Sequence, residues 1–309
     1  MNILITGGNG LIGKSVSEML NTKKNKVFSF DKIKNKNKNK NKNKKYIYYI
    51  KGNILNTKLI NNVVKKNNID VVLHFAANLG VKKTESNALD CLTVNIEGTK
   101  NILSACVKNN VKKLIFASSS EVYGNGNKRP ITETSELMPK SSYGVSKVVG
   151  ESYLKSYFEK YGLKYNILRF FNVYGPDQRD DFVVSKFKKN IKNKKPIKIY
   201  GSGNQVRSFC HVHDAARAVC IIISKGKKNQ IYNVGNDNEP IKIKDLAKKM
   251  INISKRKIKT INVPFNKSDR SLSREIFIRQ PSIRKIRQHT HYSPVVNLTK
   301  GIISVLNKN

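Results

Sequence analysis

Short apolar blocks recur along this chain, separated by polar stretches, and they predict strands and helices in alternation. The run Ile3-Leu4-Ile5 predicts a first strand, and Lys14–Leu20 predicts a helix after it. Ile69–Phe75 is a continuous apolar run, typical of strands buried on both faces of a sheet. Further strands are predicted at Lys26–Asp31, Tyr46–Ile50, Val111–Ala117 and Tyr165–Phe170, and further helices at Leu89–Lys108 and from Tyr143 to about Tyr161. This order indicates an α/β fold with a doubly wound parallel sheet.

The junction between the first strand and the first helix carries three glycines at three-residue spacing, Gly7, Gly10 and Gly13. Glycine adopts backbone angles that are closed to other residues and lets the main chain approach a ligand. The N-terminus of the helix offers unpaired N–H groups and a positive dipole end to a pyrophosphate. A turn without a ligand is the alternative, so the glycines predict a dinucleotide site only together with further residues.

Residues after the second and fourth strands refine this prediction. Asp31 ends the second strand, where an acid accepts hydrogen bonds from the adenosine ribose and repels a 2′-phosphate, which favours NAD over NADP. Ala76 and Ala77 follow the fourth strand and leave room for a cofactor, while His74 is interpreted as a packed residue. Residues 34–45 are nearly pure Lys-Asn repeat and predict a disordered surface loop, with an arm for anionic ligands as the alternative.

A hydroxyl-rich strand end and the helix that begins at Tyr143 carry the candidate catalytic groups. Ser119 lies at the carboxyl end of a predicted strand, where ligands of open parallel sheets bind. Tyr143 and Lys147 are four residues apart and share one helical face. A free tyrosine has a pKa of about 10, and we expect the Lys147 ammonium and a bound nicotinamide to lower it. The phenolate would then take a proton from a substrate hydroxyl, also bound by Ser119, while the carbon beneath gives hydride to NAD.

Composition narrows the class of protein. The chain has 309 residues, of which 39% are hydrophobic, enough to bury the core of a soluble protein. Its formal net charge of +40 raises nucleic acid or an anionic membrane surface as a partner. The lysines are spread along the chain beside asparagines, so we attribute them to genomic base composition and expect no nucleic-acid partner. No apolar span of membrane length and no secretory leader is evident, so we expect a cytoplasmic protein without a membrane contact.

The cysteines and histidines do not predict a metal site. No CxxC pair occurs, and the four cysteines lie in apolar segments, as packed thiols do: Cys91, Cys106, Cys210 and Cys220. Two histidine pairs have a spacing of two residues but no acidic or thiol companion at ligand spacing: His211 with His213, and His289 with His291. We therefore expect no bound metal.

Taken together, these motifs resemble the extended short-chain dehydrogenase/reductases, specifically the NAD-dependent nucleotide-sugar epimerase/dehydratase group. The resemblance covers nearly the whole chain and is carried by TGGNGLIG (6–13), HFAA (74–77), VNIEGT (94–99), SSSEVYG (118–124), Tyr143-xxx-Lys147, RFFNVYGPDQR (169–179), residues 199–219 and IYNVGN (231–236). It implies an NAD-binding Rossmann domain over 1–168. A smaller, mainly substrate-binding domain is implied over 169–309, with about 205–235 returning to the first domain.

The resemblance also implies roles for individual residues. NAD would contact Gly7, Asn9, Gly10, Leu11, Ile12, Gly13, Asp31, Asn53, Ile54, Ala76, Ala77, Asn95, Tyr143 and Lys147. The nucleotide sugar would contact Ser119, Asn172, Arg207 and Arg274. Asn53 stands where the group commonly has an aspartate for the adenine amino group. Members commonly dimerise through two helices, here about 89–108 and 143–161, so we expect a homodimer.

The residues after Ser119 bear on the reaction. 4,6-Dehydratases of the group usually carry an acid pair there, whereas this chain has Ser120-Glu121. We predict a nucleotide-sugar 4-epimerase, in which Tyr143 takes the C4 hydroxyl proton, NAD takes the hydride, and the hydride returns to the opposite face of the keto sugar. A UDP-glucuronate-type decarboxylase, or a 4,6-dehydratase, that uses Glu121 is the alternative. A catalytically inactive nucleotide- or RNA-binding member is a further one.

Overall fold

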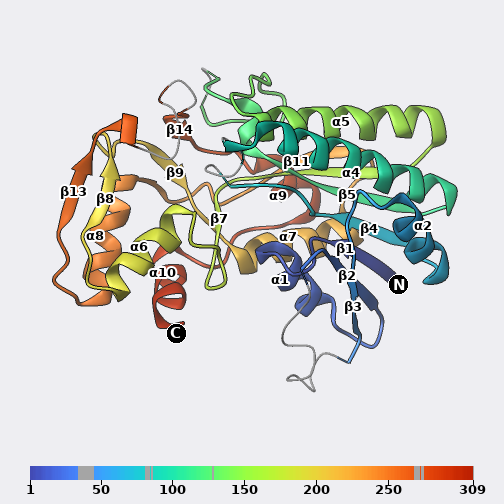
Figure 1. Cartoon of the computed structure of the whole chain (residues 1–309), viewed down its shortest axis with the longest axis horizontal. Coiled ribbons are helices and arrows are strands. Elements are labelled where there is room, and N and C mark those ends of the chain that lie inside the picture. The colour runs from blue at the N-terminus through green and yellow to red at the C-terminus, as the bar shows by residue number, and fades with distance from the viewer. Residues whose placement is uncertain are drawn as a thin grey trace.

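A computed structural model describes residues 1–33, 45–80, 84, 86–126, 129–267, 272 and 275–308. The predicted loop at 34–45 lies outside the described residues except for Lys45, and Arg274 also lies outside them. The described chain forms a large parallel sheet covered by helices, with a second, smaller domain at one end (Figure 1).

The large sheet has seven strands in the order β11-β6-β5-β4-β1-β2-β3. Neighbouring strands are parallel throughout. The strands are β1 (Asn2–Thr6), β2 (Lys26–Asp31), β3 (Ile47–Lys51), β4 (Val71–His74), β5 (Lys113–Ser119), β6 (Tyr165–Phe170) and β11 (Gln230–Val234). The strand order reverses between β1 and β4, which is the position where doubly wound sheets bind their ligands.

Helices cover both faces of this sheet because side chains alternate along each strand. Ile3 and Ile5 pack on one face, with α1 (Leu11–Leu20), α7 (Val212–Lys225) and α9 (Arg284–Thr290). Leu4 points to the other face, which is covered by α2 (Thr57–Lys66), α4 (Ala88–Lys108) and α5 (Ser142–Tyr161). Figure 1 shows α4 and α5 side by side along one edge of the molecule. The predicted doubly wound α/β fold is confirmed.

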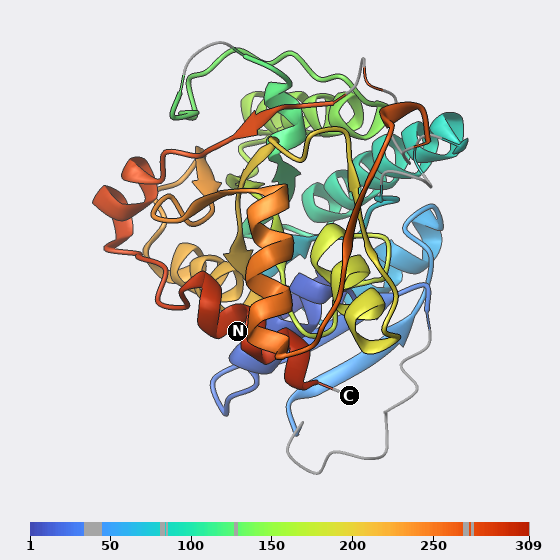
Figure 2. The ribbon, with the colours of Figure 1, turned by 90° about the vertical axis from the view of Figure 1, so that its left-hand side faces the viewer.

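The second domain has an apolar core of its own. Its described helices are α6 (Val183–Lys192), α8 (Ile243–Ser254) and α10 (Leu298–Asn307), which share a cluster that includes Phe187, Leu246 and Ile302. Figure 2 views this domain end-on, with α8 in front. Its small sheets pair β8 (Ile197–Tyr200) with β13 (Thr260–Val263), and β9 (Val206–Ser208) with β12 (Pro240–Lys242) and β14 (Ile278–Arg279). The remaining elements are β7 (Val173–Tyr174), β10 (Cys210–His211), η1 (Ser120–Tyr123) and η2 (Phe265–Lys267).

The predicted elements are present, with shifts at their ends. β2 and β6 have the predicted bounds, whereas α1 begins at Leu11, directly after the glycine turn, instead of at Lys14. β5 runs to Ser119, two residues beyond the predicted end of that strand. Of the stretch expected to return to the first domain, α7 packs on α1 and β11 is an edge strand of the large sheet, while β9 belongs to a small sheet. The boundary at 168/169 stays a prediction.

Other expectations from composition concern the membrane and the side chains with metal-binding potential. Among the described residues, no helix combines the length and the apolar character needed to cross a bilayer. All four cysteines are free thiols. His211 Nδ1 accepts a hydrogen bond from the backbone N–H of His213 at the start of α7, and His289 is hydrogen-bonded to the hydroxyl of Tyr232.

Candidate active site

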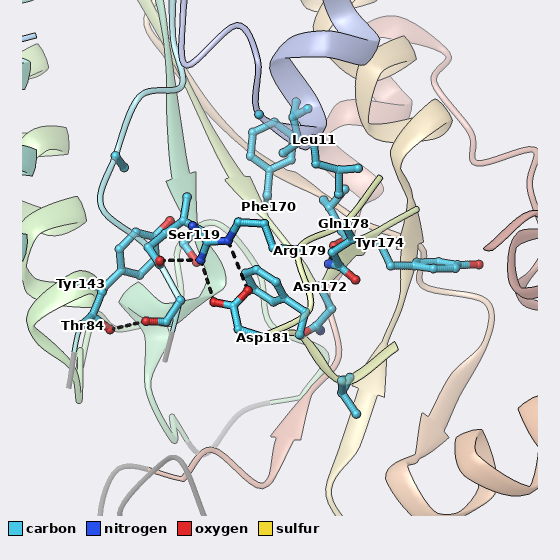
Figure 3. A pocket seen from close by; sticks show the side chains of 18 of the residues that line it. Leu11, Thr84, Ser119, Tyr143, Phe170, Asn172, Tyr174, Gln178, Arg179 and Asp181 are labelled. Carbon is cyan, nitrogen blue, oxygen red and sulfur yellow. Dashed lines mark hydrogen bonds and ion pairs between the residues drawn. The ribbon is translucent and has the colours of Figure 1, made fainter. Parts of the chain in front are cut away.

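A cavity of about 1610 Å³ brings most of the predicted site residues together. It lies at the carboxyl ends of the large sheet and extends to the second domain. Figure 3 shows Tyr143 and Thr84 on one side, Asn172 and Tyr174 on the other, and the Arg179–Asp181 ion pair between them. The predicted residues that line the cavity are Gly7, Asn9, Gly10, Leu11, Ile12, Gly13, Asp31, Asn53, Ile54, Ala76, Ala77, Ser119, Glu121, Tyr143, Lys147, Asn172 and Arg207.

The glycine turn leaves no room for side chains. Gly7 has a φ of +70°, and a Cβ there would lie 2.8 Å from the backbone nitrogen of Ala76. A Cβ on Gly13 would lie 2.3 Å from the carbonyl oxygen of Gly7. The Gly10 N–H donates to the same carbonyl at 3.0 Å, and α1 begins at the next residue. This bare backbone at a helix N-terminus is the cradle that a dinucleotide pyrophosphate requires, so the residues fit NAD.

Asp31 and Asn53 lie on the same wall as the glycine turn. The carboxylate of Asp31 accepts hydrogen bonds from the backbone N–H groups of Asn9 at 3.1 Å and Ile33 at 3.0 Å. These bonds hold the acid at the end of β2, where the ribose of NAD is expected. Asn53 accepts a hydrogen bond from the N–H of Leu55 at 3.1 Å, which fixes its side chain at the start of the following turn.

Asn95 lies behind the wall of the cavity instead of lining it. It is 3% exposed, and its amide nitrogen donates to the carbonyl oxygen of Asn78 and to Ser146 Oγ at 3.0 Å. Its role in NAD contact stays a prediction. The bond to Ser146 ties α4 to α5, and the bond to Asn78 ties α4 to the loop after β4. His74 is likewise packed, with its ring nitrogens hydrogen-bonded to Thr6 and Thr99.

Tyr143, Ser119 and Lys147 form the reactive end of the cavity. The Ser119 side chain lies close enough to the Tyr143 hydroxyl to lower the pKa of the phenol. The ammonium of Lys147 lies 5.5 Å from the centre of the Tyr143 ring and 4.7 Å from that of Phe116. This places a proton acceptor, a hydroxyl and a cation from α5 and β5 around one point.

In the protein without a cofactor, the pKa of Tyr143 is shifted in the direction opposite to the one expected beside Lys147 and a bound nicotinamide, and its direction with NAD bound stays a prediction. Burial raises the pKa of Tyr143 well above its ordinary value, and the charge of Glu121 raises it further, while the hydrogen bond from Ser119 acts in the opposite direction. Burial also lowers the pKa of Lys147 to about 8. The phenol is therefore neutral in the absence of other charges, and its ionisation requires a further positive group beside it.

Glu121 is held by a residue that the motifs did not identify. Arg279, on β14, donates to Glu121 Oε1 at 2.6 Å, and both side chains are nearly buried. Ser141 donates to the other carboxylate oxygen at 3.3 Å. The pair lines the cavity beside Tyr143. Nothing in the spacing could have predicted it, because 158 residues separate the partners.

Arg207 and Asn172 lie toward the second domain. Arg207 donates to Glu275 Oε1 at 2.6 Å and to the carbonyl oxygens of Val206 and Phe277. Asn172 has a φ of +38°, a left-handed conformation that asparagine tolerates, and its amide donates to the carbonyl oxygen of Ser208. Glu275 also lines the cavity, so the guanidinium of Arg207 is balanced by a carboxylate within it.

A second basic residue missed by the prediction lies across the middle of the cavity. Arg179 donates to the Asp181 carboxylate at 2.6 Å and to the carbonyl oxygen of Leu79 at 2.8 Å, which joins the loop after β7 to the loop after β4 (Figure 3). A Cβ on Gly80, whose φ is +106°, would lie 2.4 Å from this guanidinium. Arg179 is the last residue of the RFFNVYGPDQR segment, so this segment could have identified it.

A parallel sheet with a glycine cradle at its switch point and a buried Tyr/Lys pair beside it defines the class of extended short-chain dehydrogenase/reductases. Comparisons with known proteins agree. A family model described as the NAD dependent epimerase/dehydratase family matches residues 3–235. The chain belongs to this family, and NAD is the cofactor of the family.

Three of the matched proteins are named for three different reactions. A dTDP-D-glucose 4,6-dehydratase of Dictyostelium discoideum is 35% identical over 82% of this chain, but the chain spans only 62% of that protein. A UDP-N-acetyl-alpha-D-glucosaminuronate decarboxylase of Bacillus cytotoxicus is 32% identical over 97% of this chain and 94% of that protein. The solved structure of a UDP-glucuronic acid 4-epimerase from Bacillus cereus, in complex with UDP-glucuronic acid and NAD, has a TM-score of 0.89 at 28% identity, over 99% and 98% of the two chains. The chain thus belongs with NAD-dependent nucleotide-sugar epimerases, dehydratases and decarboxylases.

Proposed function

We propose that this chain decarboxylates a nucleotide-activated uronic acid after NAD-dependent oxidation at C4 of the sugar. The carrying observation is the Glu121–Arg279 ion pair at 2.6 Å, buried in the cavity beside Tyr143. C6 of a hexose is attached to C5, next to the C4 that Tyr143 would act on. A guanidinium near Tyr143 is therefore placed to orient a C6 carboxylate.

The oxidation rests on three side chains of this chain. Tyr143 takes the proton of the C4 hydroxyl, Ser119 hydrogen-bonds the same oxygen, and Lys147 stabilises the phenolate. The glycine cradle would hold NAD, which would supply the acceptor for the C4 hydride. Its positive ring would add the charge that the phenol needs in order to ionise.

The keto sugar is then a β-keto acid. The C5–C6 bond breaks, its electron pair moves to the C4 oxygen, and carbon dioxide leaves. Hydrogen bonds from Tyr143 and Ser119 stabilise the charge on that oxygen. C5 takes a proton from solvent, and return of the hydride to C4 with the proton of Tyr143 completes the pentose product. The positive charge of Arg279 is partly balanced by Glu121. Arg279 can therefore orient the C6 carboxylate of the substrate without stabilising it so strongly that carbon dioxide is not released.

Two other reactions use the same oxidation. A 4,6-dehydratase needs an acid that protonates the leaving C6 hydroxyl, and a carboxylate held ionised by a guanidinium is a poor proton donor. A 4-epimerase, which the motifs predicted, needs Tyr143, Ser119 and Lys147, and it needs a charged pair only where its substrate is a uronic acid. The epimerase stays the second candidate, supported by the likeness to the UDP-glucuronic acid 4-epimerase structure.

The test is incubation of the purified protein with UDP-glucuronic acid, UDP-N-acetylglucosaminuronic acid and their neutral parent sugars, with product masses read by mass spectrometry. We expect loss of carbon dioxide from the uronic acids and no reaction of the neutral sugars. Arg279→Gln should abolish that loss, whereas Arg287→Gln, on the exposed surface, should not. An unchanged mass with altered stereochemistry would instead identify the epimerase, and no turnover at all would identify an inactive binding member.

The expected homodimer is also a proposal. Helices α4 and α5 pack against each other and carry exposed apolar residues, Leu89, Val145, Phe158 and Tyr161. A second copy of this face would cover them in a helical interface. Sedimentation velocity of the wild-type protein and of a Val145→Glu variant tests this, since the variant should sediment as a monomer.

A further inference from the structure

The reaction steps described above do not yet include a buried ion pair that lies behind the catalytic groups. Glu151 on α5 and Arg169 on β6 are each 2% exposed. Arg169 Nη2 and Nε donate to the two carboxylate oxygens at 2.6 and 2.9 Å. Ser118 lies opposite Arg169 in the β5–β6 register and donates to Glu151 Oε1 at 2.5 Å. One carboxylate therefore joins a helix to two neighbouring strands.

Ser118 and Glu151 are close in the sequence to the catalytic groups. Ser118 directly precedes Ser119, and Glu151 follows Lys147 by four residues, as Lys147 follows Tyr143. Residues at this spacing share one face of a helix. We propose that Glu151 is a positioning residue for the C4 oxidation, a role that rests on the proposed function: its carboxylate holds the Lys147 ammonium and the Ser119 hydroxyl in their reacting positions.

The electrostatics around Lys147 agree with this role. Lys147 is 3% exposed, and the titratable groups that act with it come from three elements: Tyr143 and Glu151 on α5, Cys91 on α4 and His74 on β4. Burial lowers the Lys147 pKa to about 8, and Cys91 and Glu151 raise it. Among these groups Glu151 is the carboxylate, and it shares a helical face with Lys147, so its charge is the one that the experiment removes.

The test removes the charge of Glu151 and keeps its shape. In Glu151→Gln, acetylation of Lys147 by pulses of acetic anhydride is followed across a pH series by peptide mass spectrometry, because only the neutral amine reacts. We expect the midpoint, the pH at which Lys147 reacts at half its maximal rate, to fall by about one to three pH units relative to wild type. This is the effect of removing one neighbouring negative charge. The alkaline limit of kcat should move by the same amount with little change in KM.

Three further variants distinguish a positioning role of Glu151 from a general effect on the folded structure. Glu151→Asp keeps the charge and should restore the wild-type midpoint. Tyr123→Phe removes a hydrogen bond at 2.8 Å from Arg169 Nη1 without touching Glu151, and should leave the midpoint unchanged. Ser118→Ala should lower kcat at an unchanged midpoint. If Glu151→Gln does not fold, the Glu151→Gln/Arg169→Met double variant removes the guanidinium together with its carboxylate partner, so that Arg169 is not left buried and unpaired, and it should show a midpoint shift in the same direction.

Each outcome decides the proposal. A wild-type midpoint in the charge-free variant would overturn the role of Glu151 at Lys147, and unchanged kcat in Ser118→Ala would overturn its role at Ser119. If wild-type protein turns over no nucleotide sugar, the proposed function fails, and the labelling midpoint still reports whether Glu151 holds the charge of Lys147. The two failures are thus distinguishable.

Discussion

Arg207 and Arg279 stand directly opposite one another on the parallel strands β9 and β14, and each is paired with a glutamate at 2.6 Å. Glu275 balances Arg207, and Glu121 balances Arg279. Two guanidinium groups on adjacent strands would repel each other without these carboxylates. Arg207 and Arg279 are thus each balanced by a carboxylate in the protein alone. Both guanidinium groups line the cavity, where they can also bind the anionic groups of a substrate.

The first prediction concerns Arg207. Its guanidinium matches a diphosphate, so Arg207→Ala should raise KM by about tenfold to a hundredfold, the loss of a hydrogen-bonded charge, with a smaller change in kcat. Arg287→Ala, an arginine paired with Asp237 on the surface, is the control and should leave KM unchanged. Steady-state kinetics measure both. An unchanged KM in Arg207→Ala would remove this residue from the substrate site.

The second prediction concerns the glycine cradle. A methyl group on Gly13 would lie 2.3 Å from the Gly7 carbonyl oxygen, so Gly13→Ala must displace the turn that holds NAD. We expect NAD affinity to fall by at least about tenfold, read by isothermal titration calorimetry. Gly126→Ala is the matched control, because the nearest atom to a Cβ there lies at 3.6 Å. Equal NAD affinity in both variants would place the cofactor elsewhere.

The third prediction is the pH dependence of activity. Lys147 stabilises the phenolate of Tyr143, so Lys147→Met should lower kcat near neutral pH by about a hundredfold or more. Raising the pH should restore part of the activity, because the unaided phenol then begins to ionise. A pH series of kcat in both proteins measures this. A uniform loss across the series would show that Lys147 acts only in binding.

The fourth prediction is the pH dependence of stability. Burial lowers the pKa of His74 to about 3, while an unfolded histidine titrates near about 6.5. Between these values the unfolded chain binds the additional proton, so the free energy of unfolding decreases as the pH falls, by about 1.4 kcal/mol per unit at most. His74→Gln should flatten this dependence in urea melts at a series of pH values. A slope equal to wild type would assign the acid sensitivity to other groups.

Local patterns predicted the fold and the cofactor wall because they depend on neighbouring residues. The glycine spacing identifies the turn between β1 and α1, and the acid at the end of β2 needs only the strand before it. The ion pairs of the site join distant segments, such as Glu121 with Arg279, and no spacing rule relates them. The direction of the Tyr143 pKa was also beyond the pattern, since it depends on how deeply the fold buries the phenol.

The central claim is that Tyr143 removes the C4 hydroxyl proton while hydride leaves C4. The most direct measurement is a single turnover of the NAD-loaded protein with UDP-glucuronic acid carrying deuterium at C4, followed by the absorbance of reduced nicotinamide. The account predicts slower reduction than with the unlabelled sugar in wild type, and no reduction in Tyr143→Phe, which keeps the ring and loses the hydroxyl. Reduction at the wild-type rate in Tyr143→Phe, or reduction insensitive to deuterium at C4, would contradict it.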